Sequence, residues 1–245
     1  MLPKSQIKLI TSLAQKKYRI SLGLFIAEGY KTVKELLDSP MKLHRLYITN
    51  PEYRSLTKNH TLISDIELKK ISLLKTPNDI LGVFKIPDSD HIDTRGLIVA
   101  LDDIRDPGNL GTIIRLCDWF GVKSLVCSTN TVDCYNPKVV QATMGSLSRV
   151  NLSYLDLQKF LKDNSDKPIY GTFMEGQDIY KETLSDTGII VMGNEANGIS
   201  EPIARLTNKR LVIPQFGETK ATESLNVATA TSIILSEFRR SSTEK

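Results

Sequence analysis

The N-terminal third of the chain alternates between helical and strand-like spacing of its apolar residues. In residues 5–17 the apolar side chains Ile7, Ile10, Leu13 and Ala14 lie at helical spacing. Apolar runs then predict strands at 24–27, 43–49, 61–63 and 80–86, and periodic runs predict helices at 30–37 and, capped by Ser64, at 64–74. These alternating elements predict a small α/β domain in residues 1–86.

A second pattern follows a polar stretch. Residues 87–96 are acidic and bounded by Pro87 and Gly96, which predicts a linker. Strands are then predicted at 97–101, 124–127, 169–173, 189–192 and 211–213, and helices at 109–120 with Asn109 as the cap, 138–145, 156–162, 199–206 and about 224–239. Strands that alternate with helices predict a second α/β domain over 97–245, with a parallel sheet covered on both faces.

The composition is that of an ordinary globular protein, with 40% hydrophobic and 24% charged residues. No apolar run approaches the roughly 18 residues that a membrane span needs, and the N-terminus lacks the apolar core of a signal peptide. We therefore expect a cytoplasmic protein with no membrane partner. Cys117, Cys127 and Cys134 form no CxxC or Cys/His pattern, so we expect reduced thiols and no metal site.

The charge is distributed unevenly along the chain. Residues 1–86 hold 15 Lys and Arg against 7 Asp and Glu, whereas residues 87–245 hold 17 against 21. The first twenty residues carry five basic side chains and no acidic one: Lys4, Lys8, Lys16, Lys17 and Arg19. Such a concentration predicts a surface that binds a polyanion, although charge alone does not separate RNA, DNA and acidic lipid.

Several kinds of nucleotide chemistry lack their sequence signatures. No GxGxxG follows the first strand of the second domain, and no GxxxxGK[ST] occurs, which argues against dinucleotide binding and NTP hydrolysis. All three histidines precede residue 97, so a Ser-His-Asp hydrolase in the second domain is not expected. Cys117 falls on the apolar face of its predicted helix, which argues against a nucleophilic thiol there.

Three segments in a fixed order carry the strongest signal in the chain. They are DPGNLGTIIR at 106–115, VMGNEANGIS at 191–200, and a strand, polar loop and helix at 211–237 that contains Ser224-Leu225-Asn226. Together they resemble the three motifs of the SpoU (TrmH-type) RNA ribose 2'-O-methyltransferases of the SPOUT superfamily, over residues 97–240. Residues 16–37 resemble, more weakly, the L30e-like substrate-binding domain that precedes many of these enzymes.

The resemblance implies a fold, a cofactor and partners. It implies a SPOUT domain with a C-terminal trefoil knot, S-adenosylmethionine as cofactor, an RNA substrate, and a homodimer whose active site borrows from the partner chain. The L30e-like domain favours ribosomal RNA over transfer RNA. The implied catalytic and substrate-orienting residues are Asn109, Arg115, Glu195, Ser224 and Asn226. The implied cofactor-binding residues are Thr172, Phe173, Gly193, Asn194, Ile213 and Leu225.

The residues fit this chemistry. An arginine stays protonated, so Arg115 is suited to stabilise the oxyanion that develops at a 2'-hydroxyl; a base-like role for it stays open. Glu195 follows a buried strand, at the edge where open α/β sheets bind ligands. The loop 215–223 is longer than is typical of the family. Three alternative functions stay open: a tRNA 2'-O-methyltransferase, a methyltransferase that acts on a base nitrogen, and a catalytically silent RNA-binding protein. The nucleotide that is modified stays open.

Overall fold

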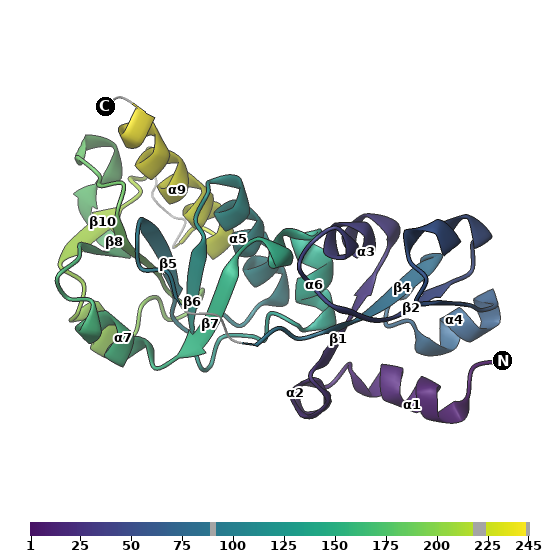
Figure 1. The fold of residues 1–245 in the computed structure, drawn as a ribbon. Coiled ribbons are helices and arrows are strands. Elements are labelled where there is room, and N and C mark those ends of the chain that lie inside the picture. Colours follow the sequence, from purple (N-terminus) through teal and green to yellow (C-terminus); the bar gives the residue numbers. More distant parts are fainter. Residues whose placement is uncertain (89–91, 218–223, 244–245) are drawn as a thin grey trace. The chain divides into compact units, whose positions relative to one another are not determined.

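The computed structural model describes residues 1–88, 92–217 and 224–243 (Figure 1). The chain divides into two compact units: Met1–Ser89 with Asp133–Arg149, and Asp90–Val132 with Val150–Lys245. Residues 133–149, which the sequence pattern placed in the second domain, therefore pack in the first unit. The predicted linker 87–96 lies partly outside the described residues, as does the end of the long loop 215–223.

The first unit is built on a four-stranded mixed sheet. Its elements are α1 (Lys4–Ser12), α2 (Lys16–Leu22), β1 (Leu24–Glu28), α3 (Tyr30–Leu37), β2 (Leu43–Ile48), the 3-10 helix η1 (Pro51–Leu56), β3 (His60–Leu62), α4 (Asp65–Ile71), β4 (Ile80–Lys85), α6 (Pro137–Thr143) and the 3-10 helix η2 (Ser146–Ser148). The strand order is β1-β4-β2-β3, antiparallel except for the β2–β3 pair. The α/β character of this segment agrees with the sequence pattern.

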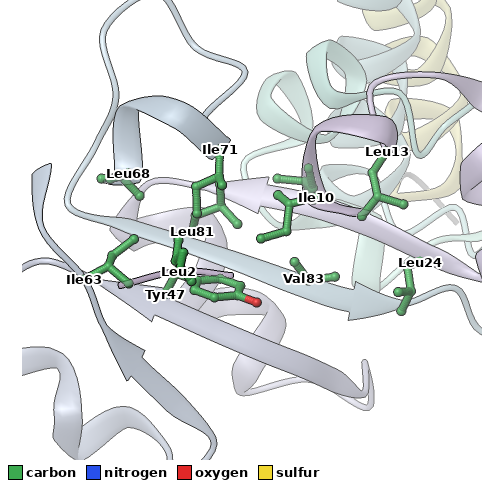
Figure 2. Close-up of a cluster of buried hydrophobic side chains, with 11 residues drawn as sticks. Leu2, Ile10, Leu13, Leu24, Tyr47, Ile63, Leu68, Ile71, Leu81 and Val83 are labelled. Atoms are coloured by element: carbon green, nitrogen blue, oxygen red, sulfur yellow. The ribbon is translucent and has the colours of Figure 1, made fainter. Parts of the chain in front are cut away.

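Successive residues of β1 face opposite sides of this sheet, as the two-residue period of a strand requires. Leu24 and Ile26 enter a buried cluster with side chains of α1, α4 and the neighbouring strands (Figure 2). Phe25 stacks on Phe84. The helical spacing in residues 5–17 corresponds to two helices: α1 ends at Ser12, where backbone bonds tighten to the i→i−3 pattern, and α2 starts at Lys16.

Residues 133–149 are fastened to the first unit by packing and charge. Helix α6 packs against β1, and the ring of Tyr135 lies 4.8 Å from that of Phe25. Arg149 forms an ion pair with Glu35 on α3. The unit is thus assembled from two stretches of sequence that lie far apart along the chain.

The second unit is built on a six-stranded sheet in which every neighbouring pair is parallel. Its elements are β5 (Leu97–Leu101), α5 (Pro107–Trp119), β6 (Ser124–Ser128), β7 (Asn151–Leu155), α7 (Leu157–Asp163), β8 (Ile169–Asp178), the 3-10 helix η3 (Ile179–Lys181), β9 (Gly188–Met192), α8 (Glu201–Ala204), β10 (Lys209–Val212) and α9 (Val227–Thr243). The strand order is β10-β8-β9-β5-β6-β7. The predicted parallel sheet is confirmed, whereas the edge strand β7 was not predicted.

Helices cover both faces of this sheet. Side chains of α7 and α8 join one buried cluster with β5, β6, β8 and β9. Helices α5 and α9 pack together, and Phe238 of α9 meets Tyr170 of β8 edge to face. Among the described residues no helix is long and apolar enough to cross a membrane; the cytoplasmic location expected from the sequence stays a prediction.

Candidate active site

The N-terminus of α5 supplies the first side chain of the site. Asp106, not Asn109, is the cap: its carboxylate accepts a hydrogen bond from the backbone N–H of Asn109 at 2.8 Å, and Pro107 occupies the first helical position. The predicted cap was therefore wrong. Because Asp106 satisfies this end of the helix, the amide side chain of Asn109 is available for other bonds.

Asn109 joins two distant segments through its side chain. Its Nδ2 donates to Oε1 of Glu195 at 2.7 Å, and its Oδ1 accepts from Nδ2 of Asn226 at 2.9 Å. Glu195 follows β9, at the carboxyl edge of the parallel sheet where such folds bind ligands. Oε2 of Glu195 has no hydrogen-bond partner within the described part of the chain, so it remains able to accept a bond from a ligand.

Asn226 performs two tasks at once. Its Oδ1 accepts from the backbone N–H groups of Ala228 and Thr229 at 3.0 and 3.2 Å, which caps α9. Its Nδ2 is thereby directed to Asn109. Ser224 is exposed, and no described residue bonds to its side chain. The structure thus brings together three of the five implied catalytic residues and leaves Ser224 beside them in sequence.

Arg115 lies on a different face of α5 from Asn109. Six residues advance an α-helix by about one and two-thirds turns, so the two side chains diverge by roughly a third of a turn. Arg115 is exposed, and none of the described residues forms a hydrogen bond or ion pair with it. Asn109 is partly buried against Glu195. Within one chain, therefore, Arg115 is not part of the Asn109 hydrogen-bond network.

The implied cofactor residues lie on three neighbouring strands, β8, β9 and β10, or in the segments that follow them. Thr172 of β8 donates its hydroxyl to the carbonyl of Val191 at 3.1 Å. The guanidinium of Arg210 stacks on the ring of Phe173, and its central carbon lies 3.5 Å from the ring centroid. Ile213 is partly exposed and Leu225 is 47% exposed, so both present apolar surface.

The loop after β9 is folded tightly on itself. Asn194 pairs with Gly198 in a backbone bridge, and its side chain donates to the carbonyl of Asp103 at 2.7 Å. A Cβ atom on Gly193 would lie 2.3 Å from the backbone of Gly198 and Ile199. Gly193 is therefore required by the fold of the loop itself, in addition to its implied place in the cofactor site.

Two further charged residues at this edge were missed. Asp102 directly follows β5 and is buried, and its carboxylate accepts a hydrogen bond from the backbone N–H of Ser200 at 2.8 Å, which fixes the start of α8. Arg210 stacks on Phe173 as described above. The position of Asp102 directly after a buried parallel strand was the signal available in the sequence; nothing local in the sequence pairs Arg210 with Phe173.

Comparison with known proteins places this geometry in a family. The model of the SpoU rRNA Methylase family matches residues 96–236, and the model of an MRM3-like substrate binding domain matches residues 4–82. The chain belongs to the SpoU rRNA methylase family. It is 28% identical to the 23S rRNA (guanosine(2553)-2'-O)-methyltransferase RlmP of Bacillus subtilis, over 93% of each chain.

Solved structures of this family have the same fold over nearly the whole chain. A TrmH-family protein from Porphyromonas gingivalis is 37% identical with a TM-score of 0.89, over 98% of this chain and 99% of that one. An AdoMet-bound rRNA methyltransferase from Sinorhizobium meliloti is 30% identical with a TM-score of 0.87, over 98% and 96%.

In this SpoU chain the predicted RNA-contacting residues divide into two groups. Lys4, Lys8, Lys16 and Lys17 are exposed on α1 and α2. Arg19 is only 2% exposed: its Nε donates to Asp133 at 2.8 Å, and its Nη1 donates to the carbonyls of Leu13 and Ala14. The prediction for Arg19 was therefore wrong, because its guanidinium holds the first unit together and is not presented to solvent.

The cysteines of this SpoU chain are structural. All three are buried and none forms a disulfide. Burial raises the pKa of the Cys117 thiol to about 12, which keeps it protonated and unreactive at neutral pH. Within the described ranges, no group of three or more His, Cys, Asp or Glu side chains could hold a metal ion.

Proposed function

We propose that this protein transfers the methyl group of S-adenosylmethionine to a ribose 2'-hydroxyl of ribosomal RNA. The observation that carries the proposal is the hydrogen-bond chain Glu195–Asn109–Asn226. It joins one residue from each of the three segments that resemble the family motifs. The named relatives, which methylate 23S rRNA or are rRNA methyltransferases, support ribosomal RNA over transfer RNA.

The residues at the carboxyl edge of β8, β9 and β10 fit the proposed cofactor. Ile213 and Leu225 present apolar surface of the kind that an adenine ring packs on. The tight loop at Gly193 and Asn194 brings backbone groups to the same edge. These residues, with Thr172 and Phe173 on β8, would hold S-adenosylmethionine. When bound, the cofactor supplies an electrophilic methyl group on its sulfonium.

The chain's own residues orient the nucleophile. Oε2 of Glu195 is available to accept a hydrogen bond from the 2'-hydroxyl, while Asn109 fixes the carboxylate and Asn226 fixes Asn109. Ser224 lies two residues from Asn226 and would add a hydroxyl at the same edge. The guanidinium of Arg115 would stabilise the negative charge that develops on the ribose oxygen.

We propose that the active enzyme is a homodimer in which Arg115 serves the partner's site. Its face of α5 points away from Asn109, so a second copy is needed to bring the two together. A groove of about 660 Å³ lies between α5 and α9, lined by Trp119 and Ile233 among others. Trp119 is 85% exposed. Among the apolar residues of α9, Ile233 is partly exposed and could contact a partner chain, whereas Val227, Ile234, Leu235 and Phe238 are buried in the core.

The same proposal includes the finer features of the fold. Residues 1–86 would be an L30e-like domain that contacts RNA through Lys4, Lys8, Lys16 and Lys17, and residues 97–245 would be the methyltransferase domain. The segment from β10 through α9 would close a trefoil knot. The bond between Asn226 and Asn109, 117 residues apart, supports a C-terminal segment that returns to the first helix of this domain.

Methyl transfer from tritiated S-adenosylmethionine to ribosomal RNA from a strain lacking the gene tests the proposal. We expect label in ribosomal RNA from the deletion strain but not from the parent, where the site is already modified. Mapping of 2'-O-methyl groups in the two strains would identify the nucleotide. Label in transfer RNA alone would contradict the ribosomal assignment, and label on a base would contradict ribose methylation.

A further inference from the structure

The first unit carries a cleft that the site described above does not use. It lies between α3 and η1 and has a volume of about 400 Å³. Apolar side chains including Leu37, Met41 and Leu56 line it together with the hydroxyls of Ser55 and Thr57. Half of the residues that line it are polar, which suits a ligand that has both an apolar face and hydrogen-bonding groups.

Two tyrosines that contact each other lie close in the chain to residues that line this cleft. Tyr30 opens α3 and Tyr53 lies in η1, with ring centroids 5.2 Å apart and planes 30° apart. Tyr30 is one helical turn before Lys34, and Tyr53 is two residues before Ser55, both of which line the cleft. Tyr30 is nevertheless 45% exposed. An exposed aromatic ring beside a cleft is a surface on which a base can stack.

The cleft also carries paired charges. Lys34 donates to the carboxylate of Asp38 one turn later, and both side chains are partly exposed. An ammonium beside a carboxylate offers a donor and an acceptor to the edge of a nucleobase. Four basic side chains within three residues of the lining residues in sequence are exposed to solvent: Lys31, Lys42, Arg54 and Lys58. This charge favours a ligand that carries phosphates.

We propose that this cleft binds an unpaired nucleotide of the RNA, with its base stacked on Tyr30 and Tyr53. A paired base cannot enter, because its faces are covered by its neighbours in the duplex. The lysines of α1 do not belong to this contact, since α1 and α3 lie on opposite faces of the sheet (Figure 1). The inference rests on the proposed function, for which it supplies a means of selecting RNA with an extruded base.

Fluorescence anisotropy with the full-length protein tests the cleft directly. The probes are a labelled oligoadenylate and a labelled blunt-ended RNA duplex of the same length. We expect Tyr30→Ala and Tyr53→Ala to weaken oligoadenylate binding about 5- to 100-fold, the range for loss of one stacked base. Tyr30→Phe and Tyr53→Phe keep the ring and should retain wild-type affinity. Duplex binding should not change in any of the four.

Two further variants serve as controls: one blocks the cleft while keeping both tyrosines, and the other removes an exposed side chain elsewhere in the same unit. Ser55→Trp fills the cleft without removing a tyrosine and should also weaken oligoadenylate binding. Ile66→Ala removes an exposed side chain of α4 that is not part of the pair, and should leave binding unchanged. Unchanged oligoadenylate affinity in Tyr30→Ala and Ser55→Trp, or an equal loss in Ile66→Ala, would overturn the proposal.

Failure of this proposal is separable from failure of the proposed function. If the wild-type protein methylates ribosomal RNA and the tyrosine variants bind oligoadenylate normally, the cleft proposal alone is wrong. If the wild-type protein transfers no methyl group yet binds oligoadenylate through the tyrosines, the proposed function is wrong and the cleft proposal stands as a nucleotide-binding site.

Discussion

At the scale of single residues, Asn226 connects the stability of a helix to the geometry of the site. Its side-chain oxygen caps α9 and its side-chain nitrogen donates to Asn109. A substitution that keeps the cap of α9 but loses the bond to Asn109 therefore separates helix stability from site geometry. Aspartate is such a substitute, because it is a good cap and favours the positive end of a helix but cannot donate.

We therefore expect Asn226→Asp to keep the unfolding free energy of the wild type and to lose most of its methyl-transfer activity. Asn226→Ala should lose activity and also about 1 kcal/mol of stability, the usual cost of removing a cap. Urea unfolding and single-turnover methyl transfer at saturating RNA measure the two effects. An active Asn226→Asp enzyme would show that the bond to Asn109 is unimportant for the reaction.

Glu28 predicts a pH dependence for the first unit. Its buried carboxylate accepts bonds from Ser72 Oγ and the backbone N–H of Leu73, and burial raises its pKa above the usual value despite these bonds. A raised pKa in the folded state contributes stability below the unfolded-state pKa, and this contribution is lost as pH rises through the folded-state value.

Glu28→Gln removes this titration and keeps an oxygen that can accept one of the two bonds. Relative to the wild type, the variant should therefore become more stable as the pH is raised from about 4 to about 7, through and above the ordinary range of a carboxyl group. Urea denaturation of both proteins across this range, followed by tyrosine fluorescence, measures the difference. A difference in unfolding free energy that does not change with pH would contradict the raised pKa.

The sequence predicted which residues belong to the site better than it predicted what each of them does there. The three motif segments placed Asn109, Glu195 and Asn226 in one site, and the structure joins them by hydrogen bonds. The cap of α5 was assigned wrongly because Asp106 and Asn109 are both good caps, and Pro107 was the local signal that favoured Asp106. The six-residue spacing between Asn109 and Arg115 already placed their side chains on different faces of α5. The sequence prediction nevertheless assigned both residues to one site.

At the scale of elements, the segment 133–149 is the least predictable part of the fold. Most strands and helices were predicted because their periodicity is local, as for α3 and β4. Nothing local indicates that α6 packs against β1, more than a hundred residues earlier. The edge strand β7 was missed because its residues are only partly buried and give a weak alternating pattern.

The buried pair Arg19–Asp133 predicts that this segment is needed for the stability of the first unit. Arg19→Ala would leave the Asp133 carboxylate without its partner and should destabilise the protein by about 3–5 kcal/mol. Lys17→Ala, two residues away and exposed, should leave stability unchanged and weaken RNA binding.

Chemical denaturation and RNA titration of both variants measure this contrast. A stable Arg19→Ala protein with weakened RNA binding would restore Arg19 to the RNA-binding surface. A fragment of residues 1–88 lacks Asp133 and α6, so its unfolding would not report on the RNA affinity of the intact unit. Point substitutions in the full chain are therefore the better test of which unit binds RNA.

At the scale of the whole molecule, the position of Arg115 determines how many chains make one site. Asn109 faces Glu195 and Asn226, whereas Arg115 faces solvent on another side of α5. If a partner chain supplies Arg115, a dimer of two differently defective chains contains one intact site. Co-expression of Arg115→Ala and Asn109→Ala chains with different affinity tags, followed by purification on both tags, isolates such mixed dimers.

We expect each variant alone to be nearly inactive and the mixed dimer to recover about half of the wild-type activity per dimer, because one of its two sites is complete. The matched control places both substitutions in one chain and pairs it with a wild-type chain. Under this sharing of residues, each site of the control dimer lacks one residue, so it should be nearly inactive. An inactive mixed dimer with a half-active control would show instead that Arg115 acts within its own chain.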